Sequence, residues 1–132
     1  GLWEWGGNEP VGAGANGVVG LPAEVMNTFS EHRSSWPMPI AELLTKGKVD
    51  VVFHGHDHFY AQEEAGGIIY QLVPQPSLGL RQNPDNLAQD YGYGGDILPS
   101  PGFIMVSVTA DGARIELLDS TKRGVIRSYT IH

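Results

Sequence analysis

The chain's most informative stretch is Val49-Asp50-Val51-Val52-Phe53-His54-Gly55-His56-Asp57-His58. It begins as an apolar, β-branched run, which is typical of a buried strand. The run leads directly into a glycine that is flanked by three of the chain's five histidines and by an aspartate. Neutral imidazole is the commonest side-chain ligand of transition metals. The stretch therefore predicts a strand whose carboxyl end presents metal-binding side chains.

His56 and His58 are the strongest candidates for metal ligands. In extended backbone these two side chains point to the same side, with about 6.5–7 Å between their Cα atoms. The two ions of a bridged pair lie roughly 3.5–4 Å apart, so this spacing suits one imidazole per ion. His54 and Asp57 would face the other way unless Gly55 bends the chain. The alternative is that these histidines are ordinary polar residues at a strand end.

The histidine stretch also carries a family resemblance. Gly55-His56-Asp57-His58 resembles the final Gly-His-x-His motif of the calcineurin-like metallophosphoesterases, in the purple-acid-phosphatase-like superfamily. The flanking segments Trp36-Pro37-Met38-Pro39-Ile40 and Tyr70-Gln71-Leu72-Val73-Pro74-Gln75-Pro76-Ser77 are similar to that family too. The opening Trp3-Glu4-Trp5-Gly6-Gly7 is similar to a segment that follows the preceding His motif in one secreted-type branch.

This resemblance covers roughly residues 1–80 and is specific around residues 49–77. It implies an α/β fold, in which the chain would be the β-rich C-terminal half of a layered α/β/β/α sandwich. It also implies a site for two divalent metal ions (Mn, Fe or Zn), where His56 would bind one ion and His58 the other. The implied substrate is a phosphoester.

The family's other ligand motifs, Asp-x-His, Gly-Asp and Gly-Asn-His, do not occur upstream of the histidine cluster. Gly7-Asn8 is followed by Glu9 rather than His, and no apolar run leads into His32. The general acid of the family would lie among the missing motifs, so the catalytic residues stay unknown. Because those motifs belong upstream and the chain begins at Gly1, we expect the C-terminal fragment of a metal-dependent phosphoester hydrolase. Alone it should be inactive, and it need not hold a metal.

His54 and Asp57 are candidates for a supporting role. His54 would orient a metal ligand or Asp57 through a hydrogen bond. Asp57 could do the same, or it could cap the turn after the strand, which is a common task for Asp in loops.

A second hypothesis is a non-catalytic, β-rich domain or degenerate fragment without a functional metal site. Two histidines are too few for a closed structural site, which usually takes about four ligands. In either case we expect self-association through the surface that a missing N-terminal half would leave.

The composition of the chain limits the classes of partner that it can bind. The net charge of −7, with eight Lys and Arg, argues against nucleic acid or an anionic membrane as a partner. No apolar run approaches the roughly 18–20 residues that span a bilayer. The absence of Cys excludes disulfides and thiolate metal sites, but it leaves the cellular location unknown.

Residues 1–132 are expected to form one partial domain. Residues 1–30 are a glycine-rich irregular segment, in which the stretch 6–17 lacks the Gly-Lys-Ser/Thr ending of a phosphate-binding loop. Residues 37–77 should form the unit that carries the metal motif. Its expected elements are a helix over 37–46 and strands over 49–53 and 67–73, with a turn at Ala65-Gly66-Gly67.

Residues 78–101 are predicted to be a long irregular stretch. Within it, Tyr91 and Tyr93 could line the mouth of a site or pack a loop onto the body. Arg81 could contact a substrate phosphate or be an ordinary solvated side chain.

The C-terminal segment, residues 103–132, predicts a β-meander. Strands over 103–109 and 114–118 flank an Asp-Gly turn. Residues 125–131 alternate with period two and should add a third antiparallel strand.

Overall fold

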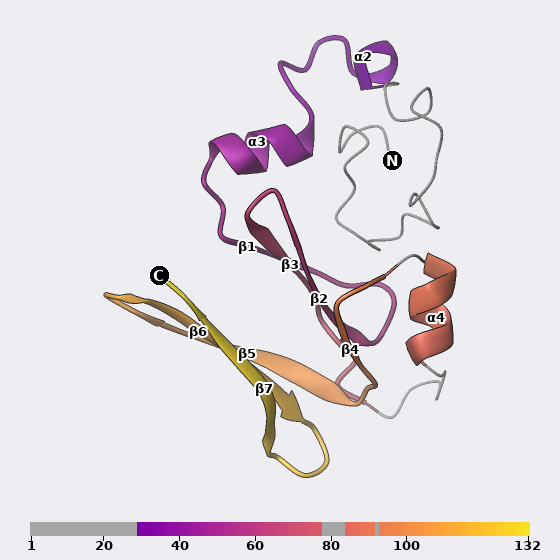
Figure 1. Ribbon diagram of the computed structural model, residues 1–132, viewed down its shortest axis with the longest axis vertical. Helices are drawn as coiled ribbons and strands as arrows, with labels where there is room; N and C mark the ends of the chain where they lie inside the picture. Colours follow the sequence, from indigo (N-terminus) through magenta and orange to yellow (C-terminus); the bar gives the residue numbers. More distant parts are fainter. Residues whose placement is uncertain (1–28, 78–83, 92) are drawn as a thin grey trace.

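The computed structural model describes residues 29–77, 84–91 and 93–132 (Figure 1). These residues are rich in β-structure, with two sheets and little helix. The helices are α2 (Phe29–His32), α3 (Ile40–Lys46) and α4 (Pro84–Tyr91). The first sheet consists of β1 (Val51–His54), β2 (Tyr60–Ala65), β3 (Ile68–Leu72) and β4 (Asp96–Leu98). The second consists of β5 (Gly102–Thr109), β6 (Gly112–Asp119) and β7 (Val125–Ile131).

Helix α3 is shorter than the predicted helix over 37–46. It begins after Pro39, whose extended backbone forms the N-cap, and a proline there sacrifices no hydrogen bond. It ends at Lys46, and the N–H of the C-cap residue Gly47 donates to the Leu43 carbonyl oxygen at 2.8 Å. None of its residues is buried, so its apolar positions do not join the core of the described residues.

The first sheet has the strand order β1-β3-β2-β4. Strand β1 runs parallel to β3, whereas β2 runs antiparallel to both of its neighbours. The β2–β3 hairpin turns at Gly66 and Gly67, whose φ angles of 61° and 77° favour glycine. This confirms the predicted turn and the strands on either side of the metal motif. The sequence did not predict β2, since the polar run 62–64 lacks a strand pattern.

The prediction that 78–101 is irregular is wrong for two of its segments. Residues 84–91 form α4, which starts at a proline as helices often do. Residues 96–98 form β4, which pairs with β2. Gly95 permits that pairing, because a Cβ at this position would collide with the Gln62 carbonyl oxygen. Arg81 lies outside the described residues, as does most of the predicted segment 1–30.

The second sheet confirms the predicted meander. Strands β5, β6 and β7 are antiparallel in that order. The turn between β5 and β6 is two residues long, shorter than predicted, because pairing extends to Thr109 and Gly112. The close approach of the Ile131 carbonyl oxygen to Gly112 leaves no room for a Cβ there.

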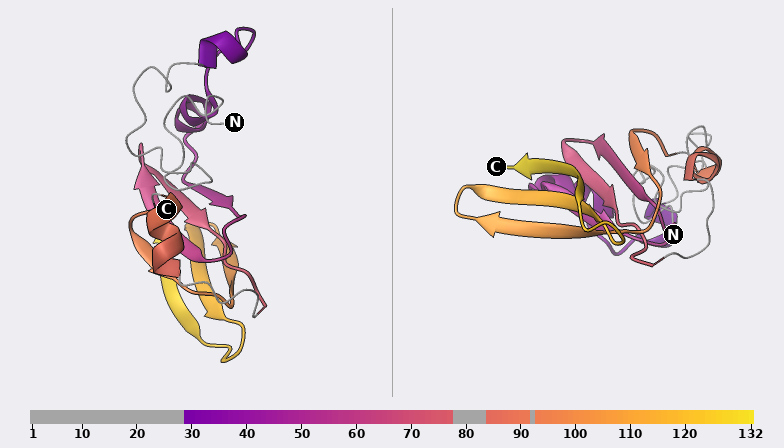
Figure 2. Two further views of the ribbon diagram at one scale, coloured as in Figure 1. Left: turned by 90° about the vertical axis from the view of Figure 1, so that its right-hand side faces the viewer. Right: turned by 90° about the horizontal axis from the view of Figure 1, so that it is seen from below.

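Helix α4 and the second sheet lie on opposite sides of the first sheet (Figure 2). One face carries the core cluster, which Ile97 extends. The cluster comprises Phe59, Ala61, Leu72, Ala88 and Tyr93. Gln71 neighbours Leu72 and therefore points to the opposite face, where it accepts a hydrogen bond from the Tyr129 hydroxyl of β7 at 3.2 Å. The site residues follow β1 on the α4 side of this arrangement.

Candidate metal site after strand β1

The backbone leaves the strand conformation immediately after His54. Both His56 (φ 101°) and His58 (φ 65°) adopt left-handed conformations. The prediction that these two residues share one side of an extended strand is therefore wrong, because pairing with β3 stops at His54. Such conformations cost about 1–3 kcal/mol in a non-glycine residue and cluster at functional sites.

A hydrogen bond from Ser100 holds the end of the loop that follows β1, at His58. The Ser100 hydroxyl donates a hydrogen bond to the carbonyl oxygen of His58. The same hydroxyl oxygen accepts one from the Gln75 N–H at 3.0 Å. The strained backbone is thus held between β1 and the segment before β5.

His56, Asp57 and Tyr93 form a hydrogen-bonded chain. The His56 Nδ1 lies 2.8 Å from Asp57 Oδ1, and the Tyr93 hydroxyl donates to Asp57 Oδ2 at 2.7 Å. The Asp57 side chain is 3% exposed, whereas the His56 side chain is 86% exposed. A buried carboxylate therefore supports an imidazole that is open to solvent.

Tyr93 is itself firmly packed. Its ring meets Phe59 edge-on with the centroids 5.1 Å apart. Its ring also lies parallel to the His54 ring, with the centroids 6.4 Å apart. Its backbone N–H donates to the Ala88 carbonyl oxygen at 2.7 Å. Of the two interpretations of this tyrosine, the structure favours packing, and it adds the hydrogen bond to Asp57.

His54 does not orient Asp57 in this structure. Both of its ring nitrogens are buried without a hydrogen-bond partner in the described structure. Burial lowers the pKa of His54, and the negative charge of Asp57 opposes that effect only in part. Its imidazole is therefore neutral at neutral pH.

The residues after β1 fit part of a metal site. A histidine that binds a metal through one nitrogen almost always donates its other N–H to a carboxylate, a carbonyl or water. His56 has this arrangement, with Nε2 remaining for an ion. His58 is exposed, and it is held by its backbone oxygen. Within the described ranges, however, no group of three or more His, Cys, Asp or Glu side chains is placed to hold an ion.

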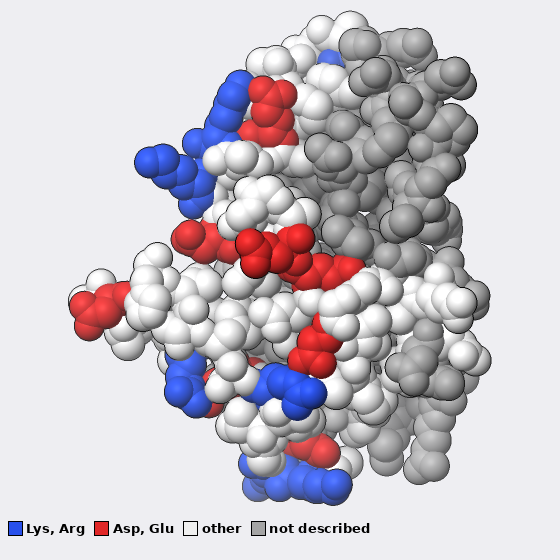
Figure 3. Space-filling view, viewed as in Figure 1, with Lys and Arg blue, Asp and Glu red and all other residues white. Residues whose placement is uncertain are grey.

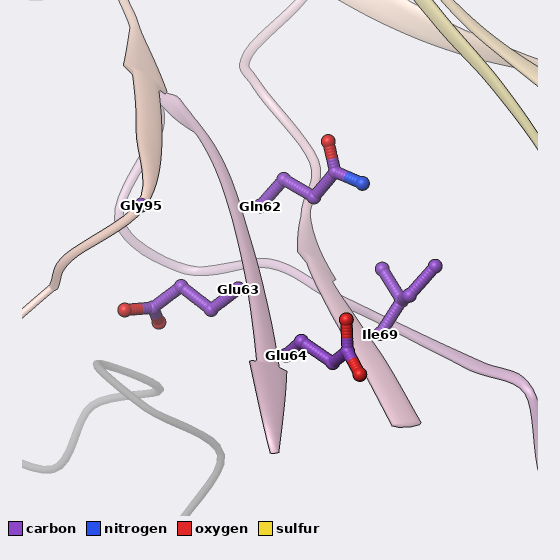
Figure 4. A pocket seen from close by; sticks show the side chains of 5 residues that line it. All are labelled: Gln62, Glu63, Glu64, Ile69 and Gly95. Carbon is purple, nitrogen blue, oxygen red and sulfur yellow. The ribbon is translucent and has the colours of Figure 1, made fainter. Parts of the chain in front are cut away.

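A separate hollow on the first sheet contains none of the residues of the histidine segment 54–58. It is open to solvent, has a volume of about 360 Å³ and is lined by Gln62, Glu63, Glu64, Ile69 and Gly95 (Figure 4). Figure 4 shows Glu63 pointing away from Gln62 and Glu64, on the other side of β2, so the two carboxylates do not converge. Glu63 Oε1 accepts from the Gly94 N–H at 2.6 Å, and burial raises the pKa of this carboxyl group.

Figure 3 shows acidic and basic side chains in separate zones of one face. Asp and Glu side chains gather in a band across the middle of that face, while Lys and Arg lie mainly above and below it. Within the described ranges, no helix combines the length and the apolar composition that a bilayer crossing requires.

No protein-family model matches the chain, and neither does any curated protein. These comparisons therefore do not test the resemblance of the Gly-His-x-His motif, which stays a prediction.

The site was only partly visible in the sequence. The structure brings together His56 and Asp57, which were both candidates, although Asp57 bonds to side chains instead of capping a turn. The link from Asp57 to Tyr93 was missed. The only available signal was the Tyr-Gly-Tyr-Gly-Gly pattern of residues 91–95, which is common in loops that pack against a body.

Proposed function

We propose that this chain supplies His56 and His58 to the dinuclear metal site of a metal-dependent phosphoester hydrolase. In this proposal the chain is the C-terminal part of a calcineurin-like metallophosphoesterase, and its two sheets belong to that family's layered α/β/β/α sandwich. The observation that supports it best is the buried carboxylate of Asp57 behind the exposed imidazole of His56.

A histidine of purely structural importance would rarely show this combination. A solvated histidine at a strand end needs neither a left-handed backbone nor a buried acid. Here the chain pays for both features around one side chain that contacts solvent. Such an arrangement is useful when the exposed nitrogen must be presented to a ligand in a fixed state.

The two metal ions would activate water and hold the oxygens of the phosphoester substrate. The part of this chain is to hold and orient ligands. Its two histidines leave most coordination positions open, so the other ligands and the general acid would come from segments outside the motif. The isolated 132-residue chain should accordingly show little or no phosphoesterase activity.

The alternative is a non-catalytic, β-rich domain without a functional metal site. The lack of a three-ligand group among the described residues is compatible with both candidates. The two candidates differ in one measurable property, which is whether a metal ion contacts His56 and His58.

The test is a titration of the chain with Zn²⁺ alone, followed by NMR of the histidine side chains. We expect selective changes at His56 and His58 that reach saturation. The variant His56→Ala should lose this binding. The control His132→Ala, which changes an exposed histidine beside the β5–β6 turn of the second sheet, should retain it. Equal binding by both variants would refute the proposed site.

A further inference from the structure

We infer that Tyr93 is a positioning residue, which acts through Asp57 to hold His56 in the tautomer with the proton on Nδ1 and the lone pair on Nε2. The meaning of this arrangement for metal binding rests on the proposed function. The arrangement itself does not, since it is a property of the metal-free chain.

The first step concerns the carboxylate. An ionised carboxylate only accepts hydrogen bonds. Tyr93 donates to one oxygen of Asp57 and His56 lies at hydrogen-bond distance from the other. With the Asp57 side chain 3% exposed, water has little access to compete for either oxygen. The Nδ1 of His56 must therefore carry the proton in this contact.

The second step concerns the tyrosine. Tyr93 is 7% exposed and its ring is confined between Phe59 and His54. Its hydroxyl cannot follow Asp57 into a different rotamer unless the end of α4 moves as well. The hydroxyl therefore fixes where the carboxylate points, and the carboxylate fixes the imidazole.

The third step concerns His56 itself. Which ring nitrogen of a neutral histidine carries the proton is set by the hydrogen bonds that the ring makes. An imidazole as exposed as this one would otherwise exchange its tautomers freely in water. The bond to Asp57 selects one of them, and it leaves the unprotonated Nε2 as the nitrogen available to a cation.

The tautomer can be measured directly by ¹⁵N NMR of the metal-free wild-type chain at pH 8. We expect His56 to be predominantly protonated on Nδ1. The same sample should also show a slowly exchanging hydroxyl proton of Tyr93, because this hydroxyl donates its hydrogen bond to a buried carboxylate. A predominantly Nε2-protonated His56, or a Tyr93 hydroxyl in fast exchange with water, would overturn the inference without the need for a variant.

The variant Tyr93→Phe then tests the role of the hydroxyl, with Tyr129→Phe as the matched control. Both remove one hydroxyl, but Tyr129 donates to the neutral amide of Gln71 on the other face of the sheet. In Tyr93→Phe we expect a mixture of His56 tautomers and an affinity for Zn²⁺ about tenfold weaker, at the lower end of the effects that such supporting groups have. The control should change neither property.

The outcomes separate the two claims. An unchanged tautomer and affinity in Tyr93→Phe would refute the positioning role. The expected tautomers without any His56-dependent binding of Zn²⁺ would support the positioning role and count against the proposed metal site.

Discussion

Glu63 offers a sharp test of how this fold handles a buried charge. Glu63 is 8% exposed, and one of its carboxylate oxygens accepts a hydrogen bond from the Gly94 N–H. The other oxygen has no hydrogen-bond partner in the described structure. Replacing the side chain with Gln keeps the shape and the acceptor for Gly94, and it removes the charge. We therefore predict that Glu63→Gln stabilises the chain at neutral and alkaline pH.

The direction with pH follows from the raised pKa of Glu63 in the folded chain. Between the unfolded and folded pKa values the native state binds more protons, so stability falls as pH rises through that range. Below the unfolded value of about 4.5 the carboxyl group is protonated in both states, and the advantage of Gln disappears.

An unsatisfied buried polar group costs about 1–3 kcal/mol, and a charged one more. The Gln amide leaves its own N–H groups partly unsatisfied, so only part of that cost is recovered. We expect Glu63→Gln to raise the free energy of unfolding by about 1 kcal/mol at pH 8 and to leave it nearly unchanged at pH 4. Urea denaturation at a series of pH values measures this difference.

The control is Glu64→Gln, the neighbouring residue, which is exposed and points to the other side of β2. It should change stability by less than about 0.5 kcal/mol at every pH. The reasoning would be refuted if Glu63→Gln were less stable than wild type at pH 8, or if its advantage were the same at pH 4.

Three other predictions concern the site and the surface. The free energy of unfolding of His58→Gly should equal that of His58→Ala or exceed it by up to about 1 kcal/mol, because glycine adopts a left-handed backbone without strain. A more stable Ala variant would show that His58 is not strained. The purified chain should not hydrolyse an aryl phosphodiester in the presence of Mn²⁺ or Zn²⁺, and turnover that His56→Ala abolishes would show that it holds a complete site. The chain should self-associate at tens of micromolar in sedimentation experiments, in part through the uncharged edge strand β5, where Met105 (42%) and Val108 (78%) are exposed; Val108→Lys should weaken that association, and a monomeric wild type would count against it.

The sequence predicted those elements that carry their own pattern. Residues 103–109 and 125–131 have strand periodicity or composition of their own, and the Asp-Gly turn joins residues 103–109 to the strand that follows it in the chain. Strand β2 was not predictable in this way. Gln62, Glu63 and Glu64 have weak strand preference. All three pair with β3, and Gln62 also pairs with Asp96 of β4. The pairing with β4 depends on a segment that is distant in sequence.

The same distinction holds for the site. His56 and Asp57 are neighbours in the chain, so composition alone drew attention to both. Tyr93 follows Asp57 by 36 positions, and no local pattern relates the two. The left-handed conformations of His56 and His58 were equally hidden, because the segment had been expected to continue in an extended form.

The bond between Tyr93 and Asp57 links two parts of the chain that can open separately. Tyr93 follows α4, and its N–H is bonded to that helix, while Asp57 follows β1. Proteins open locally in cooperative units whose free energies are smaller than that of global unfolding. If the α4 segment lifts from the first sheet, His56 loses its oriented state although both sheets stay folded. The fraction of molecules able to receive an ion would then depend on the opening equilibrium of one eight-residue helix, which amide hydrogen exchange can follow residue by residue.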